Sequence, residues 1–168
     1  MKSKKTICIL ALAVLLIGAA IVILLCTGGN KTLNLPYDWG TAIKEIRANE
    51  TVLVDGTDSL KCEASDPHPD QISELTIENN EVSFRFDQGT EGLSSIWYRL
   101  GNTASNKAQV ELLKSYYGDQ CYTENGMYFW WVDDTVIMYY SGELMYRHES
   151  FISNNSELEQ SLRAFFGK

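Results

Sequence analysis

The chain carries one uninterrupted apolar segment, residues 7–26, without a charged, amide or hydroxyl side chain. Its twenty residues, at a helical rise of about 1.5 Å each, span about 30 Å, the thickness of the hydrocarbon core of a bilayer. Three lysines precede the segment, so the positive-inside rule places residues 1–6 in the cytoplasm. The sequence therefore predicts a single-pass protein of the cell membrane whose C-terminal part lies outside the cytoplasm.

Two alternatives to a membrane anchor, a cleavable signal peptide and a lipoprotein signal, agree with parts of this segment. Gly18, Ala19 and Ala20 would suit a signal peptidase, but the apolar run continues well beyond them, which favours an uncleaved anchor. Cys26 would be the acceptor of a lipoprotein signal, although Leu25 stands where such signals carry a small residue. We expect the uncleaved anchor.

The rest of the chain has the length of one domain. Residues 27–36 are rich in Gly, Asn, Thr and Lys and predict a linker, and residues 37–168 predict a single extracytoplasmic domain. All 22 acidic residues but only 11 of the 14 basic residues follow the apolar segment. Such an acidic domain repels phosphate backbones, so we expect no nucleic-acid partner.

The hydrophobic patterns predict an α+β fold in two layers, an antiparallel sheet packed by helices on one face. Helices are expected at residues 38–48, 107–117 and 157–166. Strands are expected at residues 52–54, 60–64, 72–78, 81–86, 93–100, 127–132, 135–140 and 143–148. Two-residue turns are expected at 79–80, 133–134 and 141–142, where Asn, Asp, Ser and Gly tolerate a positive φ.

Trp39 and Gly40 lead into the first expected helix, and each half of the domain shows a helix followed by an antiparallel hairpin. This layout resembles small extracytoplasmic α+β modules such as the outer-membrane assembly lipoprotein fold and the tandem-repeat β-lactamase inhibitor proteins. The resemblance implies helices on an antiparallel sheet. It transfers no functional residue.

The last three expected strands divide their side chains between two surfaces. One surface collects Met127, Phe129, Trp131, Val136, Met138 and Met145, with Glu143 and Arg147 at its margins. It is the purer hydrocarbon surface and is expected to lie under the helices. The other is rich in rings with polar tips and includes Tyr128, Trp130, Tyr139, Tyr146 and His148, with Trp97 as an extension.

This ring-rich surface is the predicted binding site. Tyr and Trp offer contact area together with hydrogen-bonding groups, which suits a protein, peptide or glycan partner. The alternative is that the sheet curls or a loop covers these rings, so that they form a second core. The sequence leaves both possibilities open.

Catalytic and metal-binding patterns are sparse in this chain. Asp66, His68 and Asp70 alternate in a proline-containing loop and are the candidate groups for an envelope hydrolase or a metal site. Standard zinc spacing, a nucleophile-elbow motif and a phosphate-binding glycine loop are absent from the sequence, so no cofactor is expected. His148 with Ser95 or Ser141 is expected to be a coincidence.

Cys62 and Cys121 are the two cysteines beyond the apolar segment, where oxidation is permitted. They are candidates for one disulfide, and the alternative is two separate buried thiols. Taken together, the sequence predicts a non-catalytic, membrane-anchored binding or assembly module. The alternatives are the hydrolase of the Asp66–Asp70 loop and a structural subunit that associates with itself.

Overall fold

The structure, a computed structural model, describes residues 32–101, 104–151 and 156–168, which belong to one compact unit. The predicted membrane anchor, residues 7–26, lies outside the described residues. Among the helices of the described part, none is both long and apolar enough to cross a bilayer. The described unit is α+β, as predicted, and has one eight-stranded antiparallel sheet.

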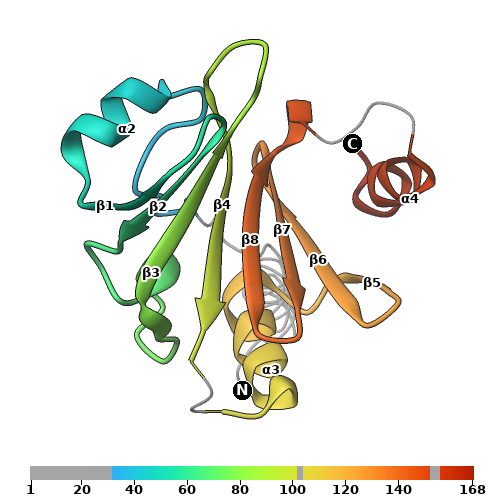
Figure 1. The fold of residues 1–168 in the computed structure, drawn as a ribbon. Helices are drawn as coiled ribbons and strands as arrows, with labels where there is room; N and C mark the ends of the chain where they lie inside the picture. Colours follow the sequence, from blue (N-terminus) through green and yellow to red (C-terminus); the bar gives the residue numbers. More distant parts are fainter. Residues whose placement is uncertain (1–31, 102–103, 152–155) are drawn as a thin grey trace, which may run out of the picture. The chain divides into compact units, whose positions relative to one another are not determined.

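Each half of the unit is a helix followed by a four-stranded meander. The first half contains α2 (Ile43–Asn49), β1 (Val52–Asp55), β2 (Ser59–Glu63), β3 (Ile77–Phe86) and β4 (Leu93–Leu100). The second half contains α3 (Asn106–Tyr117), β5 (Tyr122–Glu124), β6 (Met127–Val132), β7 (Thr135–Tyr140) and β8 (Glu143–His148). The strand order is β1-β2-β3-β4-β8-β7-β6-β5, so the last strands of the two halves pair at the centre (Figure 1).

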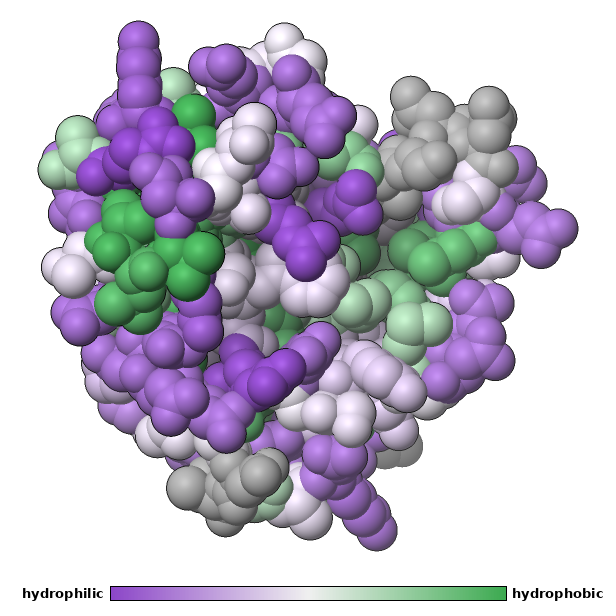
Figure 2. Space-filling model, in the orientation of Figure 1, coloured by the Kyte–Doolittle hydropathy of each residue, from purple (hydrophilic) through white to green (hydrophobic). Residues whose placement is uncertain are grey.

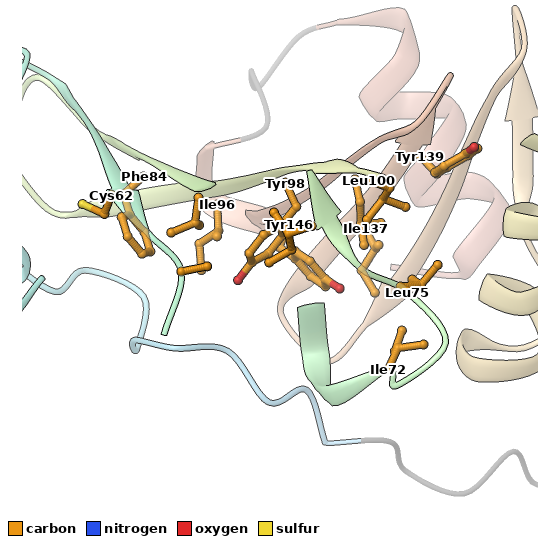
Figure 3. Packing of buried hydrophobic residues seen from close by; sticks show 14 of the residues in the cluster. Cys62, Ile72, Leu75, Phe84, Ile96, Tyr98, Leu100, Ile137, Tyr139 and Tyr146 are labelled. Carbon is orange, nitrogen blue, oxygen red and sulfur yellow. The ribbon is translucent and has the colours of Figure 1, made fainter. Parts of the chain in front are cut away.

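The main core lies on the face of the sheet that α2 and α3 cover. Ile46 of α2 and Leu113 of α3 are completely buried there against side chains of both meanders. Figure 3 shows Tyr98 and Tyr146 side by side, with Ile137 and then Leu75 to their right. Leu33 and Leu35, which fall inside the predicted linker, also pack against this core.

The opposite face, called the outer face below, carries a smaller cluster under the C-terminal helix α4 (Glu157–Phe166). Leu162 of α4 packs there with Phe129 of β6 and Val136 of β7. The prediction that helices pack on one face only is therefore wrong. Both faces of the β6–β7 pair are apolar, so each needs its own cover to remove that surface from water.

The turns of the second meander set its register as predicted. Val132 lies opposite Thr135 and Tyr140 lies opposite Glu143, so side chains alternate between the two faces as the sequence indicated. The predicted hairpin around Asn79 and Asn80 is wrong. Both residues have positive φ, but they form a bulge within the single long strand β3, and residues 72–76 precede that strand.

Two of the predicted helices have the expected ends. Ser105 caps α3 by accepting a hydrogen bond from the Ala108 N–H, and Ser156 caps α4 through the Glu159 N–H. Each cap satisfies one backbone donor that the first helical turn leaves unpaired. Gly118 and Gly167 follow the two helices with positive φ, a conformation that glycine adopts without strain.

Candidate functional site

The predicted ring-rich surface lies mostly inside the main core. Trp130 and Tyr139 are 1 % exposed and Tyr146 is fully buried. Their polar tips are satisfied from the helical layer: Trp130 Nε1 donates to the Gly118 carbonyl at 2.9 Å, and the Tyr139 hydroxyl donates to Gln109 Oε1 at 2.7 Å. These three rings belong to the main core and offer no contact surface. The alternative that the rings are buried is right, but the helical layer covers them rather than a curled sheet or a loop.

The other three predicted residues are separated from one another. Tyr128 is half-buried and lines a depression of about 510 Å³ beside α3. His148 lies against Trp39 and Phe151, with ring centroids 5.9 Å apart in both cases. Trp97 lies on the outer face, because its strand neighbours Ile96 and Tyr98 point into the main core. The prediction that Trp97 extends the ring-rich surface is wrong.

The outer face has a covered part and an open part. On this face, helix α4 packs over β6 and β7. No helix of the described residues lies over the outer face of β2, β3, β4 and β8. We call this second part the open half. Figure 2 shows hydrophilic side chains over β2–β4, with paler and apolar side chains between β8 and α4.

A groove of about 420 Å³ crosses the open half. Its lining comes from four strands and consists of Lys61, Glu78, Asn79, Glu81, Ser83, Arg85, Trp97, Tyr98, Arg99 and Glu143. A space of this size, lined by an indole and several charged groups, matches the dimensions of a site for a short segment of a ligand.

Arg85 and Trp97 form the best-defined contact of the groove. The guanidinium carbon of Arg85 lies 4.5 Å from the centroid of the Trp97 ring. The indole is itself held in place, because its Nε1 donates a hydrogen bond of 3.0 Å to Ser95 Oγ. Ser95 is only 5 % exposed, so this contact has a rigid base in the sheet.

Arg147 continues the same row of side chains. The register pairs Arg85 with Ser95 and Ser95 with Arg147, which places both arginines on the outer face on either side of the serine. Burial lowers the pKa of Arg147, and the positive charge of Arg85 lowers it further. Both effects disfavour the charged form of the Arg147 guanidinium.

The charges at the other end of the groove are paired. Lys61 pairs with Glu81, and Arg99 pairs with Glu143 at 3.2 Å and with Glu78 at 3.8 Å. Within the described residues, neither Arg85 nor Arg147 makes an ion pair. The groove therefore has an end with paired charges and an end with the uncompensated charge of Arg85. Arg147 lies beside this second end, in register with Arg85 through Ser95.

The candidate hydrolase loop uses its polar groups for its own structure. Asp66 Oδ1 accepts the His68 N–H at 2.8 Å, and His68 Nδ1 lies 2.6 Å from the Leu75 carbonyl oxygen. Asp70 accepts the Tyr117 hydroxyl at 2.9 Å and the Asn34 N–H. Across residues 32–101, 104–151 and 156–168, no group of three or more His, Cys, Asp or Glu could hold a metal ion.

His148 makes a chain of contacts with Ser150 and Asp134. Ser150 Oγ lies 2.6 Å from His148 Nδ1, and His148 Nε2 lies 3.4 Å from Asp134 Oδ2. The three residue types are those of a serine hydrolase triad, although such a triad presents Nε2 to the serine and Nδ1 to the aspartate, the reverse of the contacts of His148. The Ser150 N–H also donates to Nδ1, so the contact is that of a local turn two residues long. Asp134 is more than half exposed, and its contact is long for a hydrogen bond.

Cys62 and Cys121 are both free thiols, so the disulfide considered from the sequence is absent. Cys62 lies on β2 and Cys121 precedes β5, which is six positions away in the strand order. At about 4.8 Å per strand, this separation far exceeds the reach of a disulfide. Burial raises the pKa of the Cys62 thiol to about 11, with Glu50 and Asp55 adding to the shift.

Arg85, Ser95 and Arg147 were not predicted as site residues. Alternation along each strand does place every one of them on a face, but their proximity depends on the pairing of β4 with β8. These strands lie more than forty residues apart in sequence, with α3 and three strands between them. In the sequence each of them is one polar residue among others in its strand, so no local signal singles them out.

No protein-family model, curated protein or solved structure matches the chain.

Proposed function

We propose that the chain is a non-catalytic, membrane-anchored binding module that contacts a protein partner outside the cytoplasm through the open half of the outer face. The anchor is residues 7–26, whose length and preceding lysines support a single span with the C-terminal unit outside. The observation that carries the binding proposal is the contact between Arg85 and Trp97 in an uncovered groove.

Trp and Arg, together with Tyr, are the residue types that contribute most often to the affinity of protein interfaces. Here the Trp97 ring is fixed by its bond to Ser95, and the arginine is held over the ring. A partner therefore meets side chains that have already lost much of their freedom, which lowers the entropic cost of binding. This supports a contact role for the open half.

The charge of the unit argues against polyanionic partners. The described residues include 22 acidic and ten basic side chains. Long-range repulsion from this surface opposes association with nucleic acid or an anionic bilayer. A protein partner that inserts only a few groups into the groove interacts mainly with the charged side chains that line it.

A self-associating subunit is the second candidate, and one observation favours it. Strand β1 forms an edge of the sheet, and its Leu53 and Val54 are 44 % and 60 % exposed. An edge strand with apolar side chains is a site where another strand pairs. Contacts between copies would then involve β1 rather than the groove.

Site-specific photo-cross-linking in native membranes tests the proposal. The photoreactive residue p-benzoylphenylalanine replaces Ser83 in the groove, or Leu53 on β1, or Glu111 on the exposed side of α3 as a control. We expect position 83 to give an adduct with a different protein, identified by mass spectrometry, and position 111 to give none.

The same experiment separates the two candidates. An adduct of twice the mass of the chain from position 53, together with no adduct from position 83, would establish self-association and contradict the proposal. Identical adducts from positions 83 and 111 would indicate non-specific proximity and would also count against a groove-directed contact.

A further inference from the structure

We infer that Arg85, Ser95 and Arg147, called the arginine row below, form a subsite for a carboxylate on an acidic peptide segment of the partner. This inference rests on the proposed function and names the chemistry of the ligand.

The arginine row crosses β3, β4 and β8 at a single level of the sheet. Arg85 lies opposite Ser95, and Ser95 lies opposite Arg147. With strands about 4.8 Å apart, the two arginine Cα atoms are about 10 Å apart with the serine between them. Two guanidinium groups that flank one small residue are able to converge on a single carboxylate, which they bind through paired N–H donors.

The two arginines lack a compensating anion within the described residues. In this part of the chain neither guanidinium takes part in an ion pair or a side-chain hydrogen bond, and Arg147 is half-buried. A partly buried charge is costly unless a counter-charge accompanies it. Burial and Arg85 both lower the pKa of Arg147, and a bound carboxylate opposes this shift.

Ser95 supplies a third donor between the arginines. Its oxygen accepts the Trp97 Nε1–H at 3.0 Å, while the described residues offer its own hydroxyl hydrogen no acceptor. Because Ser95 is 95 % buried by its neighbours, that hydrogen has few alternatives to an anion bound in the row. The subsite is thus a buried hydroxyl with a guanidinium on each side.

The residues next to the arginine row indicate which side chain the rest of the ligand carries. Trp97 and Met145 lie opposite each other on β4 and β8, two residues from Ser95 and Arg147 respectively. Two residues along a strand span about 7 Å. An extended peptide with an acidic residue and, two positions away, an apolar residue therefore places its carboxylate in the arginine row and its apolar side chain on Trp97.

A peptide carboxylate fits this surface better than a phosphate polymer or an anionic bilayer. The row is a local positive site on a unit with 22 acidic and ten basic described side chains. Glu81 and Glu143 line the other end of the same groove. One carboxylate is attracted by the two arginines, whereas an extended polyanion also meets these acidic groups.

Titration of the full-length chain in detergent micelles, followed by ¹⁵N NMR, tests the subsite. The probe is a capped peptide Gly-Ser-Glu-Ser-Leu-Ser-Gly, compared with the same peptide carrying Gln in place of Glu, and with inorganic phosphate. We expect the Glu peptide to shift the Trp97 indole N–H signal saturably, and the Gln peptide to bind about tenfold more weakly or worse.

Substitutions of single arginines test whether the arginine row binds the Glu peptide. Arg85→Gln and Arg147→Gln are each expected to weaken the Glu peptide by about tenfold or more, whereas Arg47→Gln changes its affinity less than about twofold. Arg47 is the matched control because it is an exposed arginine on α2 that already pairs with Asp55. Equal binding of the Glu and Gln peptides, or equal loss in all three variants, would overturn the subsite.

The outcomes also separate this inference from the proposed function. Tighter binding of phosphate than of the Glu peptide would contradict the carboxylate assignment. If the adduct from position 83 persists in Arg85→Gln and Arg147→Gln cells, the subsite is wrong while the binding function stands. If the wild-type chain gives no adduct at all, the proposed function fails whatever the peptide does.

Discussion

The guanidinium carbon of Arg85 lies 4.5 Å from the centroid of the Trp97 ring, on the face of the sheet opposite the main core. Arg85 belongs to β3 and Trp97 to β4, so neighbouring strands bring the two side chains together. A cation over an indole face is attracted by the ring quadrupole, which holds the arginine where a ligand meets it. This contact distinguishes the open half from the charged surface around it.

Two tryptophans of the sheet are expected to respond differently to truncation. Trp130→Ala removes a ring that is 1 % exposed and hydrogen-bonded to Gly118, so we expect a loss of about 3–5 kcal/mol in the free energy of unfolding. Trp97→Ala removes a half-buried ring and is expected to cost about 1 kcal/mol. Urea denaturation followed by circular dichroism measures both. Similar losses in the two variants would contradict the assignment of Trp130 to the core and Trp97 to the surface.

Stability is expected to fall in alkaline solution because of the buried tyrosines. Burial raises the pKa of Tyr146 well above its ordinary value of 10.0, and the charge of Asp70 raises it further. Above pH 10 the unfolded chain releases this proton while the folded chain keeps it, so the free energy of unfolding decreases as pH rises. The contribution of one such group is at most about 1.4 kcal/mol per pH unit.

Tyr146→Phe is the variant that tests this dependence. It removes the titrating hydroxyl and its contact of 2.8 Å with the Tyr117 hydroxyl. We expect a loss of about 1 kcal/mol at pH 7 and a shallower decline between pH 10 and pH 12 than in the wild type. Denaturant melts at several pH values give both quantities, and an unchanged alkaline slope would contradict the assigned burial of the hydroxyl.

The cysteines report on both fold and location. In a chain with Cys8→Ser and Cys26→Ser, a membrane-impermeant maleimide applied to intact cells is expected to label half-buried Cys121 and leave Cys62 unlabelled. Cys62 is fully buried, and its raised pKa of about 11 keeps the thiol protonated at neutral pH.

Lysis and denaturation provide the controls for this labelling. Denaturant is expected to make Cys62 reactive. Labelling of Cys121 only after lysis would place the unit in the cytoplasm and contradict the proposed topology. Protection of both thiols until a reductant is added would contradict the absence of a disulfide.

The chain of contacts through His148 is expected to be structural. A fluorophosphonate probe reacts with serines that a neighbouring base activates. We expect no labelling of Ser150 in the wild-type chain, because the Ser150 N–H and Oγ contacts with His148 belong to a local turn. Mass spectrometry of the treated protein measures this, with Ser150→Ala as the control. Labelling that is lost in Ser150→Ala would favour the hydrolase alternative.

Local signals in the sequence predicted the second meander and two helices well. Two-residue turns after Val132 and Tyr140 set the register, because a loop of that length leaves little freedom in the pairing of the adjoining strands. Ser156 followed by Glu159 predicted the start of α4 for a similar reason, since the cap bond involves neighbouring residues.

The same local signal misled at Asn79 and Asn80. Both residues adopt the positive φ that a turn requires, but a bulge uses that conformation as well. The choice between them depends on β4, which pairs with β3 on both sides of the bulge. A pattern of a few residues does not contain that information.

The location of the candidate site depended on long-range pairing. Alternation separated the ring-rich side chains from the hydrocarbon side chains, but either surface was able to lie under helices. The hydrogen bonds of Trp130 to Gly118 and of Tyr139 to Gln109 explain how polar-tipped rings form a core. The arginine row exists only because β4 pairs with β8, which no short motif indicates.

Cross-linking from position 83 in two variants tests most directly whether the open half, rather than the ring-rich surface, contacts the partner. Trp97→Ala alters the groove, and Tyr128→Ala alters a half-buried ring of the other face, with circular dichroism confirming that both remain folded. We predict that Trp97→Ala abolishes the adduct and that Tyr128→Ala retains it. Retention in Trp97→Ala with loss in Tyr128→Ala would contradict the account.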